Sequence, residues 1–343
     1  MTPKQLGFQM PAEWNAHAAT WMGWPADDVE WRGQLEAVRA EFAALVRTIA
    51  RFEPVQLLVR DEDTERDARS RLEGANVRFH RFAHNDVWFR DCAPIFVTRD
   101  GEVAATDWEF NGWGKKFPHE LDNQIPDFVS SILGVKLFKP GIVMEGGALE
   151  VNGAGIVITT GQCLLNENRN PGKSAETIEN AVLENLGLET MYWLGNGLEG
   201  DHTDGHVDTI TRFANETTII TSICEDPNDP NADSLNNNPK GMREWTDARG
   251  QPFKIIKLPL PKNRLEFDGD RLAPTYANFY ICNGAVIVPT YGDPNDERAL
   301  EILRPIFPER EVIGLSSRAL ITGGGSFHCV TQQQPMGEIW RGE

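Results

Sequence analysis

The sequence predicts an α/β protein assembled from five small units, each containing a β-hairpin, an α-helix and a further strand. Three observations support this class: hairpin-like segments recur along the chain, amphipathic helices follow several of them, and a strand-like run follows these helices. Radial repetition of small sheets is how propeller proteins cover their strand edges. An ordinary mixed α/β domain is the competing interpretation.

The first unit is shared between the two ends of the chain. A strand is predicted at 19–24 (ATWMGW), a helix over 34–52, where apolar residues recur at helical spacing, and a strand at 55–59 (VQLLV). Only one candidate strand precedes this helix. The C-terminal run 325–333 (GSFHCVTQQ) could supply the missing partner, and pairing of the two ends would then close a ring.

The hairpins are predicted from β-rich arms on either side of a turn. Three of them have a dipeptide that suits a type I′ turn. They span 93–108 with Asp100-Gly101, 148–160 with Asn152-Gly153, and 279–291 with Asn283-Gly284. A looser fourth hairpin spans 207–221 and turns near Asn215.

A helix over 174–187 follows the second of these hairpins. Ser174 is its predicted N-cap, and Glu176 places an acid in the first turn, where the helix dipole favours it. The strand 190–194 (TMYWL) follows.

Another helix is predicted within 293–307, followed by a strand at 311–315 (EVIGL). The polar, Asn-rich stretch 225–241 is predicted to be a long loop and not a domain boundary. We therefore expect residues 1–343 to form a single catalytic domain.

Composition excludes several classes of function. Lys and Arg total 33 against 51 Asp and Glu, a net charge of −18, so the basic footprint of a nucleic-acid-binding protein is absent. No run approaches the roughly 18 apolar residues of a membrane span, and the N-terminus lacks the apolar core of a signal peptide. Five cysteines without a CxxC pair predict reduced thiols and a cytoplasmic location.

The stretch 200–213 (GDHTDGHVDTITRF) is unusually rich in histidine and aspartate. It could be a zinc site, an acid/base centre or a solvated loop. His206 and Asp208 would share one face of a strand, whereas His202 precedes the turn at Gly205. No segment with metal-ligand spacing offers a third ligand, which weakens the zinc hypothesis.

The glycine-rich stretch 321–335 leads into a predicted strand that contains Cys329. A cysteine there is either a small buried hydrophobe or a nucleophile. His328 would face the opposite side of that strand, so a base has to come from elsewhere, and His206 is the best candidate.

Two further stretches carry acids in ordinary settings. In 85–97 (NDVWFRDCAPIFV), Trp88, Arg90 and Asp91 crowd the entry of a hairpin and would suit a structural cluster. Glu145, in MEGGALEV, precedes two glycines and taken alone is an exposed acid in a turn.

Six motifs, taken in order, resemble the agmatine deiminase family. They are MPAEWNAHAATWMGWP, DVWFRDCAP, FNGWGKKF, MEGGALEVNG, HTDGHVDTITRF and GGGSFHCVTQQQP, which run from residue 10 to residue 335. The resemblance implies the pentein fold of guanidino-group-modifying enzymes, a pseudo-symmetric five-bladed α/β propeller.

The resemblance also implies a catalytic set. Cys329 takes the position of the nucleophile and His206 that of the acid/base. Asp91 and Asp208 match the two carboxylates that clasp the guanidinium, and Glu145 matches the acid that supports the histidine and the substrate nitrogens.

Trp88 falls where an aromatic side chain lines the substrate pocket. Two positions depart from the family's pattern: Ala93, where a glycine is usual, and His202, where an acid is usual. That second loop helps to bind the far amine of agmatine, so we expect another acid of the loop, Asp204 or Asp201, to meet it.

The implied reaction is hydrolysis of agmatine to N-carbamoylputrescine and ammonia through a covalent thiouronium intermediate, without metal or cofactor. The expected partner is a small cationic guanidine, and a homo-oligomer is compatible with the sequence. The alternatives are a deiminase of arginine, peptidyl-arginine or a methylated arginine, and an amidinotransferase. A non-enzymatic propeller protein is disfavoured, because the chain keeps every catalytic position.

Overall fold

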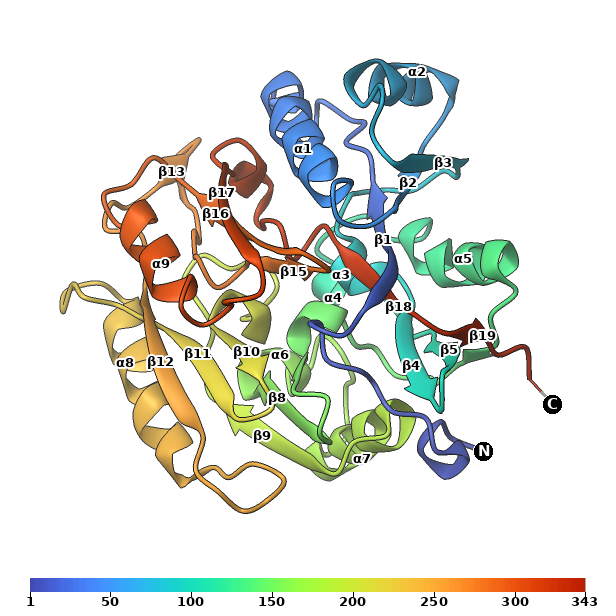
Figure 1. The fold of residues 1–343 in the computed structure, drawn as a ribbon. Coiled ribbons are helices and arrows are strands. Elements are labelled where there is room, and N and C mark those ends of the chain that lie inside the picture. The colour runs from blue at the N-terminus through green and yellow to red at the C-terminus, as the bar shows by residue number, and fades with distance from the viewer. Residues whose placement is uncertain (343) are drawn as a thin grey trace.

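The computed structural model describes residues 1–342 and confirms the predicted α/β class. Within these residues, five mixed sheets of three or four strands recur (Figure 1). Their strands are β18 (Gln332–Pro335), β1 (His17–Gly23), β2 (Val55–Val59) and β3 (Val77–Arg81); β4 (Ile95–Arg99), β5 (Glu102–Thr106), β6 (Leu137–Phe138) and β19 (Glu338–Ile339); β7 (Glu150–Val151), β8 (Ile156–Thr160) and β9 (Thr190–Leu194); β10 (Thr211–Asn215), β11 (Thr218–Ile223) and β12 (Lys254–Pro259); and β15 (Tyr280–Cys282), β16 (Ala285–Thr290) and β17 (Glu311–Ser316).

Helices join the strands, and Figure 1 shows the longer ones at the periphery with the strands inside. The helices are α1 (Leu35–Ile49), α2 (Glu62–Arg71), α3 (Phe89–Cys92), α4 (Gly112–Lys115), α5 (Ile125–Leu133), α6 (Gly161–Leu164), α7 (Ala175–Leu186), α8 (Asn231–Gly241) and α9 (Asp296–Leu303). The 3₁₀ helices are η1 (Lys4–Leu6), η2 (Asp122–Gln124), η3 (Gly146–Ala148), η4 (Val207–Thr209), η5 (Met242–Glu244) and η6 (Leu320–Gly323), and a small ribbon pairs β13 (Glu266–Phe267) with β14 (Asp270–Arg271).

Each large sheet combines an antiparallel pair with a parallel one. In β10–β11–β12, for example, β10 pairs antiparallel with β11, α8 crosses over, and β12 pairs parallel with β11. The same order recurs in β7–β8–α7–β9 and β15–β16–α9–β17. A parallel third strand needs such a crossover, because its start lies at the far end of the sheet.

The two ends of the chain meet as the sequence predicts. β1 pairs antiparallel with β18 and parallel with β2, so residues near both termini share one sheet. The rings of Phe8 and Trp340 also lie 5.2 Å apart. Two expectations stay predictions: that the five units form one closed propeller, and that the chain forms a single domain.

The turns differ in part from those predicted. Asp100 and Gly101 both have positive φ, as a type I′ turn requires. Asn152 does not, and four residues separate β7 from β8 there. The turn between β15 and β16 has two residues, Asn283 and Gly284, without positive φ, so type I′ was wrong for both.

The predicted helix boundaries are largely confirmed. The Ser174 side chain caps α7 by accepting from the Thr177 N–H at 3.2 Å. The stretch predicted as a long loop, 225–241, is a loop only in its first part. Its second part forms α8, where the apolar side chains Ala232 and Leu235 are buried.

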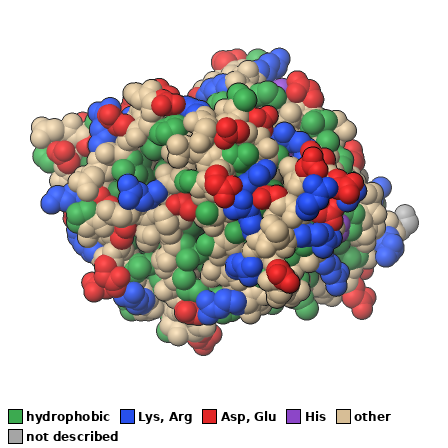
Figure 2. Space-filling model, turned by 90° about the horizontal axis from the view of Figure 1, so that it is seen from above, with side chains coloured by type: hydrophobic (Ala, Val, Ile, Leu, Met, Phe, Trp, Pro, Cys, Tyr) green, Lys and Arg blue, Asp and Glu red, His purple; other side chains and the backbone are tan. Residues whose placement is uncertain are grey.

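The surface seen from above carries Lys and Arg side chains interspersed with Asp and Glu (Figure 2). Among the residues that the structure describes, no helix has the length and apolar character needed to cross a membrane.

Gly187 ends α7 at the point where the N-terminal segment docks. Its φ is +65°, and a Cβ built there would lie 1.9 Å from the Phe8 carbonyl oxygen. We expect Gly187→Ala to lower the free energy of unfolding by about 2–4 kcal/mol, from left-handed strain plus the clash. Urea denaturation measures this free energy.

The matched control is Gly172→Ala. Gly172 has a φ of +75° with open space around it, so this substitution should lower the free energy of unfolding by only about 1–2 kcal/mol. Equal losses would contradict the steric argument.

Candidate active site

Cys329 lies in a turn and not in the strand that the sequence predicts. The turn covers 327–330, and β18 begins only at Gln332. The Asn278 amide holds the buried cysteine twice: Nδ2 donates to Sγ at 3.2 Å, and Oδ1 accepts from the Cys329 N–H at 3.3 Å. A Cβ built on Gly325 would lie 3.1 Å from Sγ, so glycine there keeps one side of the sulfur uncovered.

The segment that carries His206 and Asp208 is not a strand either. Both residues lie at η4, before β10 begins, so strand alternation does not explain why they approach one another. His206 immediately precedes η4. Its backbone N–H donates to the side chains of Asp201 and Thr203, each at 3.1 Å.

Asp91, His206 and Asp208 converge on the backbone of Gly147. A Cβ built at this glycine would lie 2.6 Å from His206 Nδ1, 2.7 Å from Asp91 Oδ1 and 3.2 Å from Asp208 Oδ2. The Gly147 N–H donates to Asp91 Oδ1 at 3.0 Å, and the Trp113 indole donates to Oδ2 at 3.0 Å. Any other residue at position 147 would fill the space that the three side chains share.

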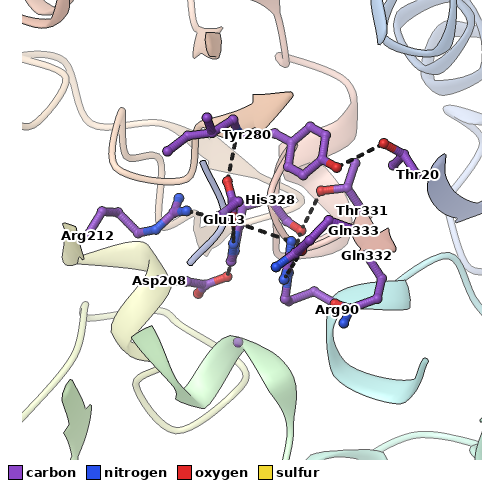
Figure 3. Close-up of polar contacts among 12 residues, drawn as sticks. Glu13, Thr20, Arg90, Asp208, Arg212, Tyr280, His328, Thr331, Gln332 and Gln333 are labelled. Atoms are coloured by element: carbon purple, nitrogen blue, oxygen red, sulfur yellow. Dashed lines mark hydrogen bonds and ion pairs between the residues drawn. The ribbon is translucent and has the colours of Figure 1, made fainter. Parts of the chain in front are cut away.

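Asp208 links the thiol to a chain of buried ion pairs. Its Oδ2 lies 3.6 Å from Cys329 Sγ and 2.6 Å from His328 Nδ1. His328 Nε2 lies 2.7 Å from Glu13, whose carboxylate also accepts from Arg212 at 3.0 Å (Figure 3). Both ring nitrogens of His328 are engaged by carboxylates, those of Asp208 and Glu13. His328 is therefore not free to act as a base.

Glu145 is fully buried near His206, but its carboxylate contacts Arg169 and Cys163 and makes no hydrogen bond to the histidine. Its Oε1 accepts from Arg169 Nε at 2.6 Å, and its Oε2 lies 4.0 Å from the Cys163 thiol. One ligand atom each from Glu145, Cys163 and His206 lies within 4.8 Å of the others. A metal would meet the Arg169 guanidinium there, since Nη2 is also 3.9 Å from the thiol. The cluster is therefore better suited to an ion pair than to a cation site.

Asp204 does not lie where a substrate-binding acid is needed. Its carboxylate accepts from Lys116 at 2.6 Å, Arg169 at 2.5 Å and Asn168 at 3.0 Å, and it is absent from the lining of the reactive cavity. Two cations already neutralise it. These ion pairs disfavour the expectation that Asp204 meets the distal amine, which stays a prediction. Asp201 is also engaged, because it accepts from Thr203 at 2.6 Å.

Trp88, Asp91 and Cys329 line one narrow cavity of about 40 Å³. The rest of its lining consists of Asp86, Trp113, Phe117, His202, Thr203 and Gly323–Gly325. A larger cavity of about 900 Å³ lies elsewhere, among segments 224–231 and 260–265, and contains none of the predicted site residues.

The two departures from the family's pattern have different consequences. Ala93 is buried, with φ −79° and ψ 162°, a conformation open to any residue, so the missing glycine changes nothing in the backbone. His202 lies in the cavity wall, with its Nδ1 3.1 Å from a Cβ built on Gly324.

The ionisable groups around the cavity have pKa values that are shifted in different directions. Burial raises the pKa of Asp91 to about 6. Burial also tends to raise the pKa of Asp208. The hydrogen bond from His328 and the charge of His328 outweigh burial, and they hold the pKa of Asp208 below its usual value. Burial opposes charging of His206, yet Asp91 and the other acids nearby raise its pKa well above normal. Burial, Asp208 and Asp91 together raise the pKa of Cys329 well above that of a free thiol.

This arrangement can perform covalent chemistry on a planar cation. Two carboxylates offer bidentate acceptors, a thiol lies beside one of them, and an imidazole lies beside the other. The sequence did not point to Asn278, Cys163, Arg169 or Glu13 as contributors. They come from distant segments, and each looks like an ordinary structural residue by itself; Trp113 lies in FNGWGKKF, which served only for the resemblance.

Known proteins match this chain over nearly its whole length. Residues 9–335 match the family described as Porphyromonas-type peptidyl-arginine deiminase. An agmatine deiminase of Ectopseudomonas mendocina is 38% identical, covering 97% of each chain. The solved agmatine deiminase of Enterococcus faecalis has a TM-score of 0.94 at 34% identity, covering 98% of each chain.

A more distant structure bears on the fold alone. An amidinotransferase from Microseira wollei is 12% identical, with a TM-score of 0.53 over 97% of this chain and 99% of that one. The extent and identity of the nearer matches decide the family. The chain belongs to the Porphyromonas-type peptidyl-arginine deiminase family, and its agmatine deiminase relatives resemble it from end to end.

Proposed function

We propose that the protein hydrolyses the guanidinium of agmatine, giving N-carbamoylputrescine and ammonia. The convergence at Gly147 carries this proposal. Asp208 Oδ1 and both ring nitrogens of His206 are buried there without a hydrogen-bond partner among the described residues. Buried polar atoms normally have partners, and the N–H groups of a planar guanidinium would satisfy the carboxylate oxygen.

In the proposed mechanism, Asp91 and Asp208 hold the guanidinium with its carbon facing Cys329. The positive charge of the substrate favours the thiolate, and the thiol proton is released to solvent. The thiolate sulfur then forms an S–C bond while the π electrons of the guanidinium C–N bond move onto nitrogen, which gives a neutral tetrahedral adduct. His206 gives its proton to the departing nitrogen, the C–N bond breaks and ammonia leaves.

The second half of the reaction releases the covalent thiouronium. His206, now neutral, takes a proton from a water molecule as the oxygen bonds to the carbon. The C–S bond then breaks and the ureido product departs. Glu145 is assigned a supporting role through Arg169 and Cys163, and Trp88 is assigned to the cavity wall.

The cavity favours agmatine over arginine. Its lining contains two acids, Asp86 and Asp91, and no Lys or Arg. The α-carboxylate of arginine calls for a cation, whereas agmatine carries a second positive charge. Relatives named agmatine deiminase match nearly the whole chain, which also favours agmatine.

We also propose that the five sheets are blades of one pseudo-symmetric five-bladed propeller, the pentein fold. Repetition of the hairpin–helix–strand order, and the pairing of β1 with β18, support a ring closed by the two ends.

A substrate panel tests the proposed function. The purified protein is supplied with agmatine, arginine, 4-guanidinobutyrate and a peptidyl-arginine, and ureido product and ammonia are measured with no amine acceptor present. Agmatine should have the highest kcat/KM. A preference for arginine would overturn the substrate assignment, and a reaction that requires an added amine would indicate an amidinotransferase.

Cys329→Ser should lower kcat by about a thousandfold or more, because an alcohol is a much weaker nucleophile than a thiolate. A haloacetamidine should form one adduct, located at Cys329 by peptide mass spectrometry. An unchanged melting temperature serves as the control for folding. Labelling at Cys92 or Cys163, together with an active serine variant, would contradict the assignment.

The pH profile should report Asp91. Its pKa of about 6 lies in a window where His206, with its raised pKa, stays protonated and Asp208, with its lowered pKa, stays ionised. As pH falls through about 6, Asp91 is protonated and loses the charge that binds guanidinium. We therefore expect kcat/KM for agmatine to decline about tenfold per pH unit below that value.

Asp91→Asn should be much less active and should lose this acid limb. Agmatine itself keeps both charges throughout the window, so the substrate does not contribute. Persistence of the same limb in Asp91→Asn would show that another group titrates.

Activity should be independent of metal. Arg169 already supplies a cation to the Glu145–Cys163–His206 cluster, so we expect dialysis against a strong chelator to leave the rate unchanged. Elemental analysis of the dialysed protein is the companion measurement. A stoichiometric metal whose removal abolishes turnover would return the zinc hypothesis.

A further inference from the structure

Neither acid of the loop expected to meet the distal amine lines the reactive cavity, although Asp201 is held only by the neutral donors of Thr203 and His206. Asp204 is paired with two cations, and His202 is not an acid. Besides Asp91, the acid among the lining residues of the reactive cavity is Asp86.

Asp86 lies at the opposite end of the Trp88 indole from Cys329. At one edge of the ring, a Cβ built on Gly325 would lie 2.6 Å from Cζ3 of the indole and 3.1 Å from Cys329 Sγ. At the other edge, Nε1 donates to Asp86 Oδ2 at 2.8 Å. The indole therefore runs along the cavity with the nucleophile at one end and a carboxylate at the other.

The Asp86 carboxylate keeps acceptor capacity. Oδ1 accepts from the Val87 N–H at 2.7 Å and Oδ2 from Trp88, both neutral donors. A carboxylate offers about four lone-pair sites, so about two stay free. The backbone beneath it is fixed, because the N–H of Asp86 donates to Asp122 at 3.2 Å.

Acids outnumber cations around this end of the cavity. Arg60 approaches Asp27 and Glu30, each at 3.8 Å, and makes no ion pair with Asp86. Burial and the charge of Asp86 raise the pKa of Glu30 to about 8. Burial likewise raises the pKa of Asp86 itself. A positive charge placed at this end of the cavity would stabilise both carboxylates in their ionised form.

The length of agmatine matches this separation. Six bonds join its guanidinium carbon to its terminal nitrogen, the same number as in two residues of extended chain, which span about 7 Å. That span covers the indole plus one hydrogen bond. A guanidinium held at Asp91 beside Cys329 would therefore place the terminal ammonium at the far end of Trp88.

We propose that Asp86 is the specificity-determining residue that binds the terminal ammonium of agmatine, with Trp88 orienting its carboxylate. This inference rests on the proposed function, because it assigns the tail of that substrate.

The test compares agmatine with butylguanidine, which has the same carbon chain and no ammonium. In Asp86→Asn the side chain keeps its shape and loses its charge. Its single oxygen can still accept from the indole, but the contact with the Val87 N–H is then given up, and the butylguanidine control measures that loss. We expect kcat/KM for agmatine to fall about tenfold to a hundredfold, and that for butylguanidine to change by less than about threefold. Where butylguanidine turnover is slow, its competitive inhibition constant replaces kcat/KM.

Asp204→Asn is the matched control, since it makes the same chemical change outside the cavity. It should leave the agmatine-to-butylguanidine ratio as in the wild type, whatever it does to the absolute rate. If Asp86→Asn loses turnover, calorimetric binding of both ligands to Cys329→Ser with and without Asp86→Asn gives the same ratio.

The outcomes separate the two proposals. A wild-type enzyme that does not turn over agmatine refutes the proposed function. If the wild type prefers agmatine but Asp86→Asn keeps the wild-type ratio, only the assignment of Asp86 fails. If the agmatine-to-butylguanidine ratio falls in Asp204→Asn instead, the terminal ammonium of agmatine binds at the loop 201–205.

Discussion

The buried carboxylate of Glu13 is the contact on which the rest of the site depends. It accepts from the Arg212 guanidinium at 3.0 Å, from His328 at 2.7 Å and from the backbone N–H of Ile281 at 2.7 Å. Arg212 lies in β10, His328 in the turn that carries Cys329 and Ile281 in β15. Burial opposes charging of Glu13, but Arg212 and His328 hold its pKa well below the usual value. Removing one partner of such a group typically costs about 3–5 kcal/mol, because the remaining charge is left uncompensated.

The charge states of the acids at the cavity depend on this series of buried ion pairs. Asp208 shares His328 with Glu13, and the hydrogen bond and charge of His328 hold its pKa low. Asp91 lies 3.7 Å from His206, a longer contact, and burial raises its pKa to about 6. The same two carboxylates raise the pKa of the Cys329 thiol in the free enzyme. A bound guanidinium would supply the missing positive charge, so binding and activation of the sulfur become one event. A thiol that is protonated until substrate arrives is also protected from oxidation, which requires thiolate character.

Much of the fold could be predicted from the sequence, because hairpin arms and amphipathic helices have local signatures. Ser174 caps its helix as expected, and β1 finds its C-terminal partner in β18. Turn geometry was less readable: Asn283 and Gly284 suit a type I′ turn but do not adopt one. Cys329 and His206 were predicted to lie in strands, and neither does. Gly147 could not be recognised as the meeting point of Asp91, His206 and Asp208, because that role exists only after distant segments pack together.

Two of the three acids considered for the substrate tail show why its binding partner could not be predicted from the sequence. Asp204 and Asp86 look alike in the sequence, each a short acid beside a glycine-rich or aromatic motif of the resemblance. Their difference lies in the partners that folding brings to them. Lys116 and Arg169 give Asp204 two cations, while Asp86 receives only neutral N–H donors. A carboxylate that is already neutralised gains little from a further ammonium, whereas one held by neutral donors keeps its full attraction. The number of cations that each acid meets in the folded chain therefore decides which of them can select a charged substrate.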